Sequence, residues 1–204
     1  MSLQALTALF DPTTEQAKRF GGSSDDDLNP GFRLPSLPKL RDAAVLVAIS
    51  EDRAGRAEVL LTRRASTLRS HAGQIAFPGG KIDAEDASPV FAALREAHEE
   101  VGLPRQAVEV LGEIPPHVTG TGYRITPVVA RITTPFIPRP EPGEVAEIFS
   151  VPLPFVLDRN NYRIESRSWL GQTRHYYTVP WGPYYIWGAT ARILRALADH
   201  IDAP

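Results

Sequence analysis

Short apolar runs separated by polar turns cover much of the chain and predict strands. The first run extends from Ala43 to Ile49, and the polar turn EDRAGRA separates it from a second run from Glu58 to Thr62. Short apolar runs bounded by turn residues are typical of strands. Further strands are expected at 74–77, 108–114, 125–132, 147–151 and 175–179.

Two segments have helical signals. Ser88 is a suitable N-cap, Pro89 fits the first helical position, and Gly102 is a typical residue just past a helix end. These residues predict a helix from Pro89 to Val101, and a last helix is expected from Ala189 to His200. Strands mixed with two main helices indicate an α/β fold.

The helix at 89–101 places three carboxylates on one face. At about 100° per residue and with Arg95 at zero, Glu99, Glu96 and Glu100 fall near 40°, 100° and 140°. The opposite face is expected to be the buried stripe, and it is formed by Val90, Phe91, Leu94, Ala97 and Val101. His98 falls beside this stripe and is expected to be a packed or boundary residue.

Three carboxylates on one arc repel one another unless a positive charge lies among them. A hard cation such as Mg²⁺ or Mn²⁺ prefers oxygen ligands and would relieve the repulsion. The alternative is a solvated face on which Arg95 pairs with Glu99.

Length and composition favour one domain. The chain has 204 residues, of which 43% are hydrophobic, enough for one sizeable core. Residues 1–42 are expected to form an arm, flexible in part or packed on the domain, because they are rich in Gly, Ser, Asp and Pro around a short helical stretch near Leu3 to Phe10. Residues 43–204 are expected to form the domain, in which prolines 135, 138, 140 and 142 stiffen one loop.

Charge and residue usage exclude several classes of protein. Because 22 basic residues face 24 acidic ones, a nucleic-acid binder is not favoured, and the basic stretch between Leu60 and Ile82 suggests a small anionic ligand. The absence of cysteine excludes disulfides and thiolate ligands. Without an apolar stretch of about 20 residues or a secretory leader, the chain is expected to be cytoplasmic and without membrane contact. A homodimer is compatible with the sequence.

The segment REAHEEVGL at 95–103 resembles the second half of the Nudix box, in which an Arg-Glu pair, two further glutamates and a glycine recur at this spacing. The box usually begins with a glycine followed by five residues and an acid. Here that position is Asp86, one residue further from the arginine than usual, and Glu85 is the alternative.

The preceding residues resemble the coenzyme A pyrophosphatase branch of the Nudix hydrolases. The matching residues are Leu60, Leu61, Thr62, Arg64, Ala65, Arg69, Gly73 and the run Phe77-Pro78-Gly79-Gly80. Weaker similarity extends to 122–129, 143–153 and 186–194. The resemblance implies a Nudix fold, a mixed β-sheet sandwiched between α-helices.

The resemblance also implies hydrolysis of the pyrophosphate bond of CoA or acyl-CoA, giving 3',5'-ADP and (acyl-)4'-phosphopantetheine. Mg²⁺ or Mn²⁺ would be held by Glu96, Glu99 and Glu100, with Arg95 orienting Glu99. The general base would be a box glutamate such as Glu99, or Glu144 after the proline-rich loop. The expected substrate-binding residues are Arg64, Arg69, His71, Gly79, Gly80 and Lys81.

Two other functions remain compatible with the sequence. One is the same hydrolysis on another nucleoside diphosphate derivative, such as ADP-ribose, NADH or an oxidised nucleotide. The other is a Nudix-fold module that binds a nucleotide without hydrolysing it. The C-terminal aromatic residues either stack on adenine or fill a core or interface; they are Tyr176, Tyr177, Trp181, Tyr184, Tyr185 and Trp187.

Overall fold

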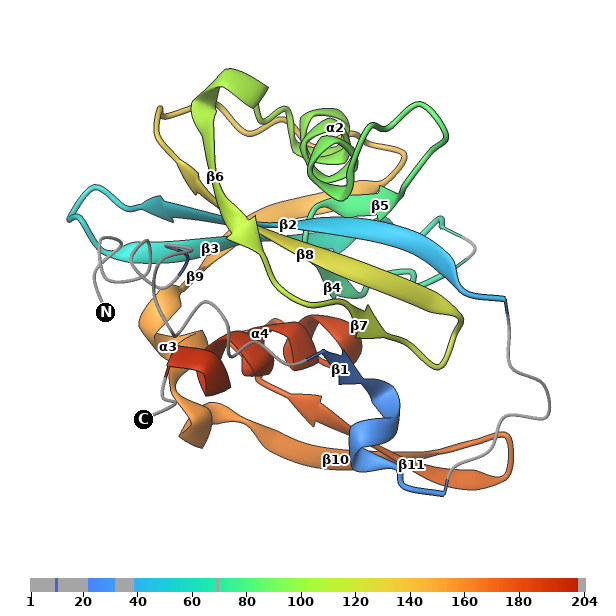
Figure 1. Cartoon of the computed structure of the whole chain (residues 1–204). Coiled ribbons are helices and arrows are strands. Elements are labelled where there is room, and N and C mark those ends of the chain that lie inside the picture. The colour runs from blue at the N-terminus through green and yellow to red at the C-terminus, as the bar shows by residue number, and fades with distance from the viewer. Residues whose placement is uncertain (1–9, 11–21, 32–38, 69, 202–204) are drawn as a thin grey trace.

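The computed structural model describes residues 10, 22–31, 39–68 and 70–201 of the chain. A nine-stranded mixed sheet separates helix α2 on one face from helices α3 and α4 and a two-stranded ribbon on the other (Figure 1). The elements of the sheet are β1 (Ser23–Ser24), β2 (Arg41–Glu51), β3 (Ala57–Arg64), β4 (Ile75–Ala76), β5 (Gly79–Lys81), β6 (Val108–Glu113), β7 (His117–Val118), β8 (Tyr123–Ile132) and β9 (Val145–Pro152).

The ribbon and the helices complete the fold. The ribbon consists of β10 (Arg163–Trp169) and β11 (Gln172–Thr178). The α-helices are α2 (Pro89–Val101), α3 (Leu153–Leu157) and α4 (Gly188–Ile201), and short 3-10 turns lie at 25–28, 105–107 and 159–161. A mixed sheet sandwiched between helices confirms the expected Nudix architecture.

The sheet is centred on β2, which pairs with β8 in parallel from Arg41–Tyr123 to Ile49–Arg131. Side chains alternate between the two faces of a strand, so Leu46 packs toward α2 and Val47 packs toward α4. Both are completely buried. The strand therefore supplies two separate cores, and its length exceeds the predicted run from Ala43 to Ile49.

The buried face of α2 is rotated from its predicted position. Ala93, Ala97 and Glu100 are buried, whereas Phe91 is 46% exposed and His98 is exposed. The prediction that Phe91 belongs to the buried stripe is therefore wrong, and His98, expected to be a packed or boundary residue, is not packed. The small alanine side chains let the backbone of α2 approach the sheet, and this turns Glu100 inward.

Local signals otherwise predicted the elements well. Helix α2 has its predicted ends, with the Ser88 hydroxyl accepting from the Phe91 N–H and Gly102 in the left-handed conformation at φ 70°. The Gly79-Gly80 pair lies in β5, which pairs with β2. Strand β10 and helix α3 were not predicted.

Part of the N-terminal arm is integrated into the domain. Ser23 and Ser24 pair in parallel with His117 and Val118, so β1 extends the sheet. The helix expected near residues 3–10 lies almost wholly outside the described residues. Within the described ranges, the helices are too short or too polar to cross a membrane.

Candidate active site

Strand β5 brings a glycine pair against the acidic face of α2. The Gly79 N–H donates to a Glu100 carboxylate oxygen at 3.2 Å. A Cβ at Gly79 would lie 2.6 Å from the Cα of Val45, and a Cβ at Gly80 would collide with the Glu96 carboxylate. Backbone packing therefore requires glycine at Gly79, whereas glycine at Gly80 leaves room for the flexible Glu96 carboxylate.

Arg95 connects the loop before α2 to the helix. Its Nε and Nη2 donate to the two oxygens of Asp86 at 3.1 and 2.9 Å. Its Nη1 donates to Glu96 at 3.0 Å and to Glu99 at 3.1 Å. The hydrogen bonds from Arg95 hold the pKa of Asp86 below its usual value. Asp86, rather than Glu85, is thus the acid that braces this loop.

Three carboxylates converge beside the glycine pair. One oxygen from each of Glu96, Glu100 and Glu144 lies within 4.8 Å of the others. Glu100 is 3% exposed, whereas Glu144 is exposed. Glu99 is not a member of this group, and its exposed carboxylate pairs with Arg95, as the sequence suggested. The structure therefore brings two of the three predicted metal ligands together with Glu144.

Glu144 reaches the cluster because the proline-rich loop is attached to the end of α2. The N–H groups of Arg139 and Glu141 donate to the carbonyls of Val101 and Glu100 at 3.0 and 2.9 Å. The Glu144 carbonyl accepts from the N–H of Ala65 at 2.8 Å. These backbone bonds fix both ends of the loop, so a residue 44 positions after Glu100 lies beside it.

Burial and mutual repulsion change the protonation of the cluster. Burial is the main cause that raises the pKa of Glu100 to about 7, and the nearby Glu96 and Glu144 add to it. Burial also raises the pKa of Glu96, with Glu99 and Glu144 contributing. A cation among the oxygens would offset both effects, and an all-oxygen donor set suits a hard divalent ion.

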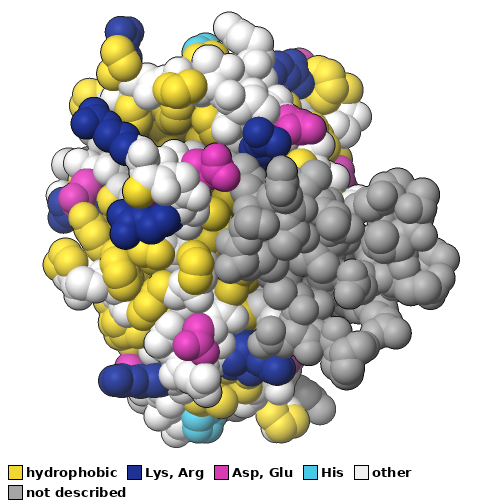
Figure 2. Space-filling model, turned by 90° about the vertical axis from the view of Figure 1, so that its left-hand side faces the viewer, with side chains coloured by type: hydrophobic (Ala, Val, Ile, Leu, Met, Phe, Trp, Pro, Cys, Tyr) yellow, Lys and Arg dark blue, Asp and Glu magenta, His cyan; other side chains and the backbone are white. Residues whose placement is uncertain are grey.

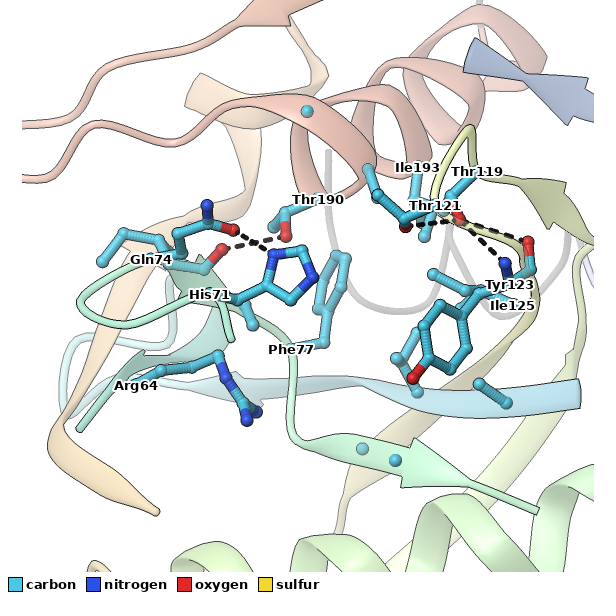
Figure 3. Close-up of a pocket in the computed structure, with 18 of the residues that line it drawn as sticks. Arg64, His71, Gln74, Phe77, Thr119, Thr121, Tyr123, Ile125, Thr190 and Ile193 are labelled. Atoms are coloured by element: carbon cyan, nitrogen blue, oxygen red, sulfur yellow. Dashed lines mark hydrogen bonds between the residues drawn. The ribbon is translucent and has the colours of Figure 1, made fainter. Parts of the chain in front are cut away.

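The predicted substrate-binding residues lie around the same opening. Arg64 projects into the cavity and His71 lies across from it, with its Nδ1 2.9 Å from the Gln74 side-chain oxygen (Figure 3). An Arg64 Nη lies 3.8 Å from Glu100, while its buried Nε has no hydrogen-bond partner. Lys81 also lines the cavity. Arg69 lies outside the described residues.

The cavity has a volume of about 670 Å³ and extends beyond the glutamates. Its walls come from both layers of the fold: Arg64 and β5 lie toward α2, and Thr190 and Ile193 belong to α4 (Figure 3). Such a volume suits a small-molecule ligand. Asp25, Thr121 and Arg174 also line the cavity, although they were not predicted as site residues. No local motif marks them, because they come from segments distant in the sequence.

The C-terminal aromatic residues fall into two groups. Tyr177, Trp181 and Tyr184 pack against the core beneath α4. Tyr176 and Trp187 instead line the cavity, and Tyr185 is 42% exposed. The core alternative is therefore confirmed for the first group, whereas stacking on adenine stays a prediction for the second.

The outer surface also bears on the kind of ligand. On the side shown in Figure 2, basic and acidic side chains of the described residues are interspersed among hydrophobic ones. A nucleic-acid-binding face is expected to carry a continuous basic patch instead.

Comparisons with known proteins agree with this geometry. A model of the NUDIX domain matches residues 39–169. A protein of Photorhabdus laumondii named uncharacterized Nudix hydrolase NudL is 42% identical over 84% of this chain and 93% of its own length. Its namesake in Salmonella paratyphi B is 45% identical over 79% of this chain and 83% of its own length. The crystal structure of RenU, a Nudix hydrolase of M. smegmatis, has a TM-score of 0.50 and 30% identity, covering 59% of this chain and 76% of that one. On these matches the chain belongs to the Nudix hydrolase family and is a pyrophosphohydrolase.

Proposed function

We propose that the protein hydrolyses the pyrophosphate bond of coenzyme A or acyl-CoA with Mg²⁺ or Mn²⁺, releasing 3',5'-ADP and (acyl-)4'-phosphopantetheine. The observation that carries the proposal is the convergence of Glu96, Glu100 and Glu144 beside Arg64 in one cavity. Carboxylates suit the metal, and a guanidinium suits the phosphates.

Each residue near the cluster has a role in this proposal. Glu96, Glu100 and Glu144 would hold the cation, and Glu99, at the exposed rim, would complete the ligand set or take a proton from the attacking water. A bound divalent ion would supply Lewis-acid stabilisation of the phosphate oxygens. Glu144 is the other candidate for the base, since it is the exposed member of the group.

Other residues would position the reacting groups. Arg95 would act by orienting Glu96 and Glu99, since it donates to both. Arg64 would neutralise a phosphate through its terminal guanidinium nitrogens, because the side chain lines the cavity beside the glutamates. Gly79, Gly80, Lys81 and His71 would line the path of the diphosphate, and Arg69 is proposed from the family resemblance alone.

The residues before α2 support CoA as the substrate through that resemblance. The test is mass-spectrometric analysis of products from CoA, acetyl-CoA, ADP-ribose, NADH and an oxidised nucleotide, each with Mg²⁺ and with Mn²⁺. We expect 3',5'-ADP from the CoA substrates, a loss of at least a hundredfold in Glu100→Gln, and wild-type rates in Glu113→Gln, an exposed glutamate of β6.

Two results would contradict parts of the proposal. Products from another diphosphate but none from CoA would overturn the substrate and leave the hydrolysis intact. Tight nucleotide binding without product, with metal supplied, would overturn the hydrolysis itself.

A further inference from the structure

The wall of the cavity opposite the glutamates is formed by one face of the β10–β11 ribbon. In this antiparallel pair Arg167 lies opposite Arg174, and Glu165 lies opposite Tyr176. Residues directly opposite in an antiparallel pair share a face. Arg167, Arg174 and Tyr176 all line the cavity, so the ribbon presents two arginines and an aromatic ring to it.

An aromatic pair with an overlying guanidinium lies at this wall. The rings of Tyr176 and Trp187 are 5.2 Å apart and inclined at 63°. The Arg167 guanidinium lies 4.5 Å from the Trp187 ring centroid and 6.0 Å from that of Tyr176. Trp187 is only partly buried and Arg167 is exposed, so these side chains do not serve solely to fill a core.

The charges on this face are incompletely balanced. Two arginines directly opposite one another repel. Arg174 is neutralised by Asp25, whose carboxylate lies 2.5 Å from its Nη2, and Glu165 accepts a hydrogen bond from the Tyr185 hydroxyl at 2.6 Å. Arg167 forms no ion pair within the described part of the chain, and its contacts are with the rings. An anion bound beside Arg167 would remove the remaining repulsion.

We propose that Tyr176, Trp187 and Arg167 form a subsite for the nucleotide half of the substrate, in which the base stacks on the aromatic pair and Arg167 binds a phosphate carried by the ribose. This proposal rests on the proposed function, in which that half is adenosine 3',5'-bisphosphate. A flat ring with an attached anion matches this wall, whereas a flexible aliphatic chain would leave the guanidinium without a partner.

The proposed subsite lies outside the catalytic half that Nudix proteins share. Its residues could therefore determine which substrate is bound without changing the catalytic residues. Tyr176 and Trp187 lie beyond residues 39–169, the part that matches the NUDIX domain. Helix α2, which carries Glu96 and Glu100, lies on one side of the sheet, and the ribbon lies on the other side with α4 (Figure 1). A substrate bound in the cavity would therefore place its diphosphate and its base in different layers of the fold.

The test measures binding of the products by calorimetry without metal, so that it does not depend on turnover. The probes are 3',5'-ADP, 5'-AMP and 4'-phosphopantetheine. Trp187→Leu should weaken both nucleotides by roughly tenfold, since stacking of one base contributes about 1–3 kcal/mol. Arg167→Gln should weaken 3',5'-ADP by about tenfold and 5'-AMP much less. Trp187→Phe should retain most of the affinity.

A second arginine–aromatic pair supplies matched controls. The Arg105 guanidinium lies 4.0 Å from the ring centroid of the exposed Phe91, outside the cavity. Arg105→Gln and Phe91→Leu should leave nucleotide binding unchanged. Unaltered 3',5'-ADP affinity in Arg167→Gln, whose exposed side chain is not needed for folding, would overturn the subsite. Selective loss of 4'-phosphopantetheine binding would overturn it as well, because the ribbon wall would then bind the phosphopantetheine half of the substrate instead of the nucleotide half.

Failure of the proposed function has a different signature. If CoA is not hydrolysed but the affinity for 3',5'-ADP still depends on Arg167 and Trp187, the nucleotide subsite is supported and CoA is excluded as the substrate. If CoA is hydrolysed and neither Arg167→Gln nor Trp187→Leu changes the KM, the subsite is excluded and the proposed function is supported.

Discussion

Replacing Glu100 by glutamine in the metal-free protein should change how stability depends on pH. The carboxyl is 3% exposed and lies beside Glu96 and Glu144, and its pKa is raised to about 7, mainly by burial. Glutamine has nearly the same shape and keeps an oxygen to accept the Gly79 N–H. The substitution therefore removes an ionisable group with little change in packing.

The size of the effect follows from proton linkage. Because the folded protein binds this proton more tightly than the unfolded chain does, the protonated carboxyl contributes stability below pH 4.5 that is lost as pH rises through about 7. The difference between 4.5 and about 7 corresponds to about 3 kcal/mol. Most of this, roughly 2–3 kcal/mol, falls between pH 5 and pH 8.

Urea unfolding followed by circular dichroism, with EDTA at pH 5, 6, 7 and 8, measures this contribution. The free energy of unfolding of the wild type should fall by roughly 2–3 kcal/mol more than that of Glu100→Gln over this range. Glu99→Gln, at the exposed rim, should behave as the wild type. Mg²⁺ added at pH 8 should stabilise the wild type more than Glu100→Gln. Equal pH dependence in wild type and Glu100→Gln would refute the assignment of a destabilised, buried carboxylate.

Five further substitutions test the local geometry. Gly80→Ala should leave the melting temperature nearly unchanged yet weaken Mn²⁺ binding in calorimetry, because the new Cβ displaces the flexible Glu96 carboxylate. Gly79→Ala should instead lower the melting temperature, because its Cβ meets the backbone of Ala44 and Val45. Asp86→Asn should lower kcat by about 10–100-fold, since it weakens the bidentate contact that orients Arg95; an unchanged kcat would show that the brace is dispensable. Leu94→Ala, at a 7% exposed position, should lower the free energy of unfolding in urea by about 2–5 kcal/mol. Phe91→Ala should lower it by about 1 kcal/mol or less. Similar losses in the two variants would contradict the observed orientation of α2.

Residues that act through local geometry could be predicted from the sequence. Ser88, Pro89 and Gly102 determine the ends of α2, because capping depends only on neighbouring backbone groups. The spacing of Arg95 and Glu99 predicted their contact, which occurs at 3.1 Å. The choice between Asp86 and Glu85 depended on the loop conformation, and only the structure resolved it.

One rotation accounts for the errors along α2. The large apolar residues placed the buried face around Leu94 and Phe91, whereas packing against the sheet centres it on Ala93 and Ala97. Alanine has little hydrophobic weight in a periodicity argument, but its small size permits close approach of a helix to a sheet. The same rotation exposes Phe91 and buries Glu100, so the misplaced hydrophobic residue and the unexpectedly buried acid have one cause.

The substrate half of the cavity was not predictable for a related reason. Asp25 and Arg174 are 149 positions apart in the sequence, and no spacing rule joins them. Trp187 was expected only as a candidate for stacking on adenine or filling a core. Asp25 and Arg174 meet because Asn29 exchanges hydrogen bonds with the backbone of His175, at 3.0 and 2.7 Å, while Asp25 binds Arg174. Two of the three clustered glutamates lie on one helix, and backbone bonds between the proline-rich loop and α2 bring Glu144 to them. The proposed nucleotide wall instead exists only when the N-terminal segment, the ribbon and α4 have assembled. Substitutions at Asn29 should accordingly alter KM for the substrate before they alter metal affinity, because they loosen the wall and leave α2 intact.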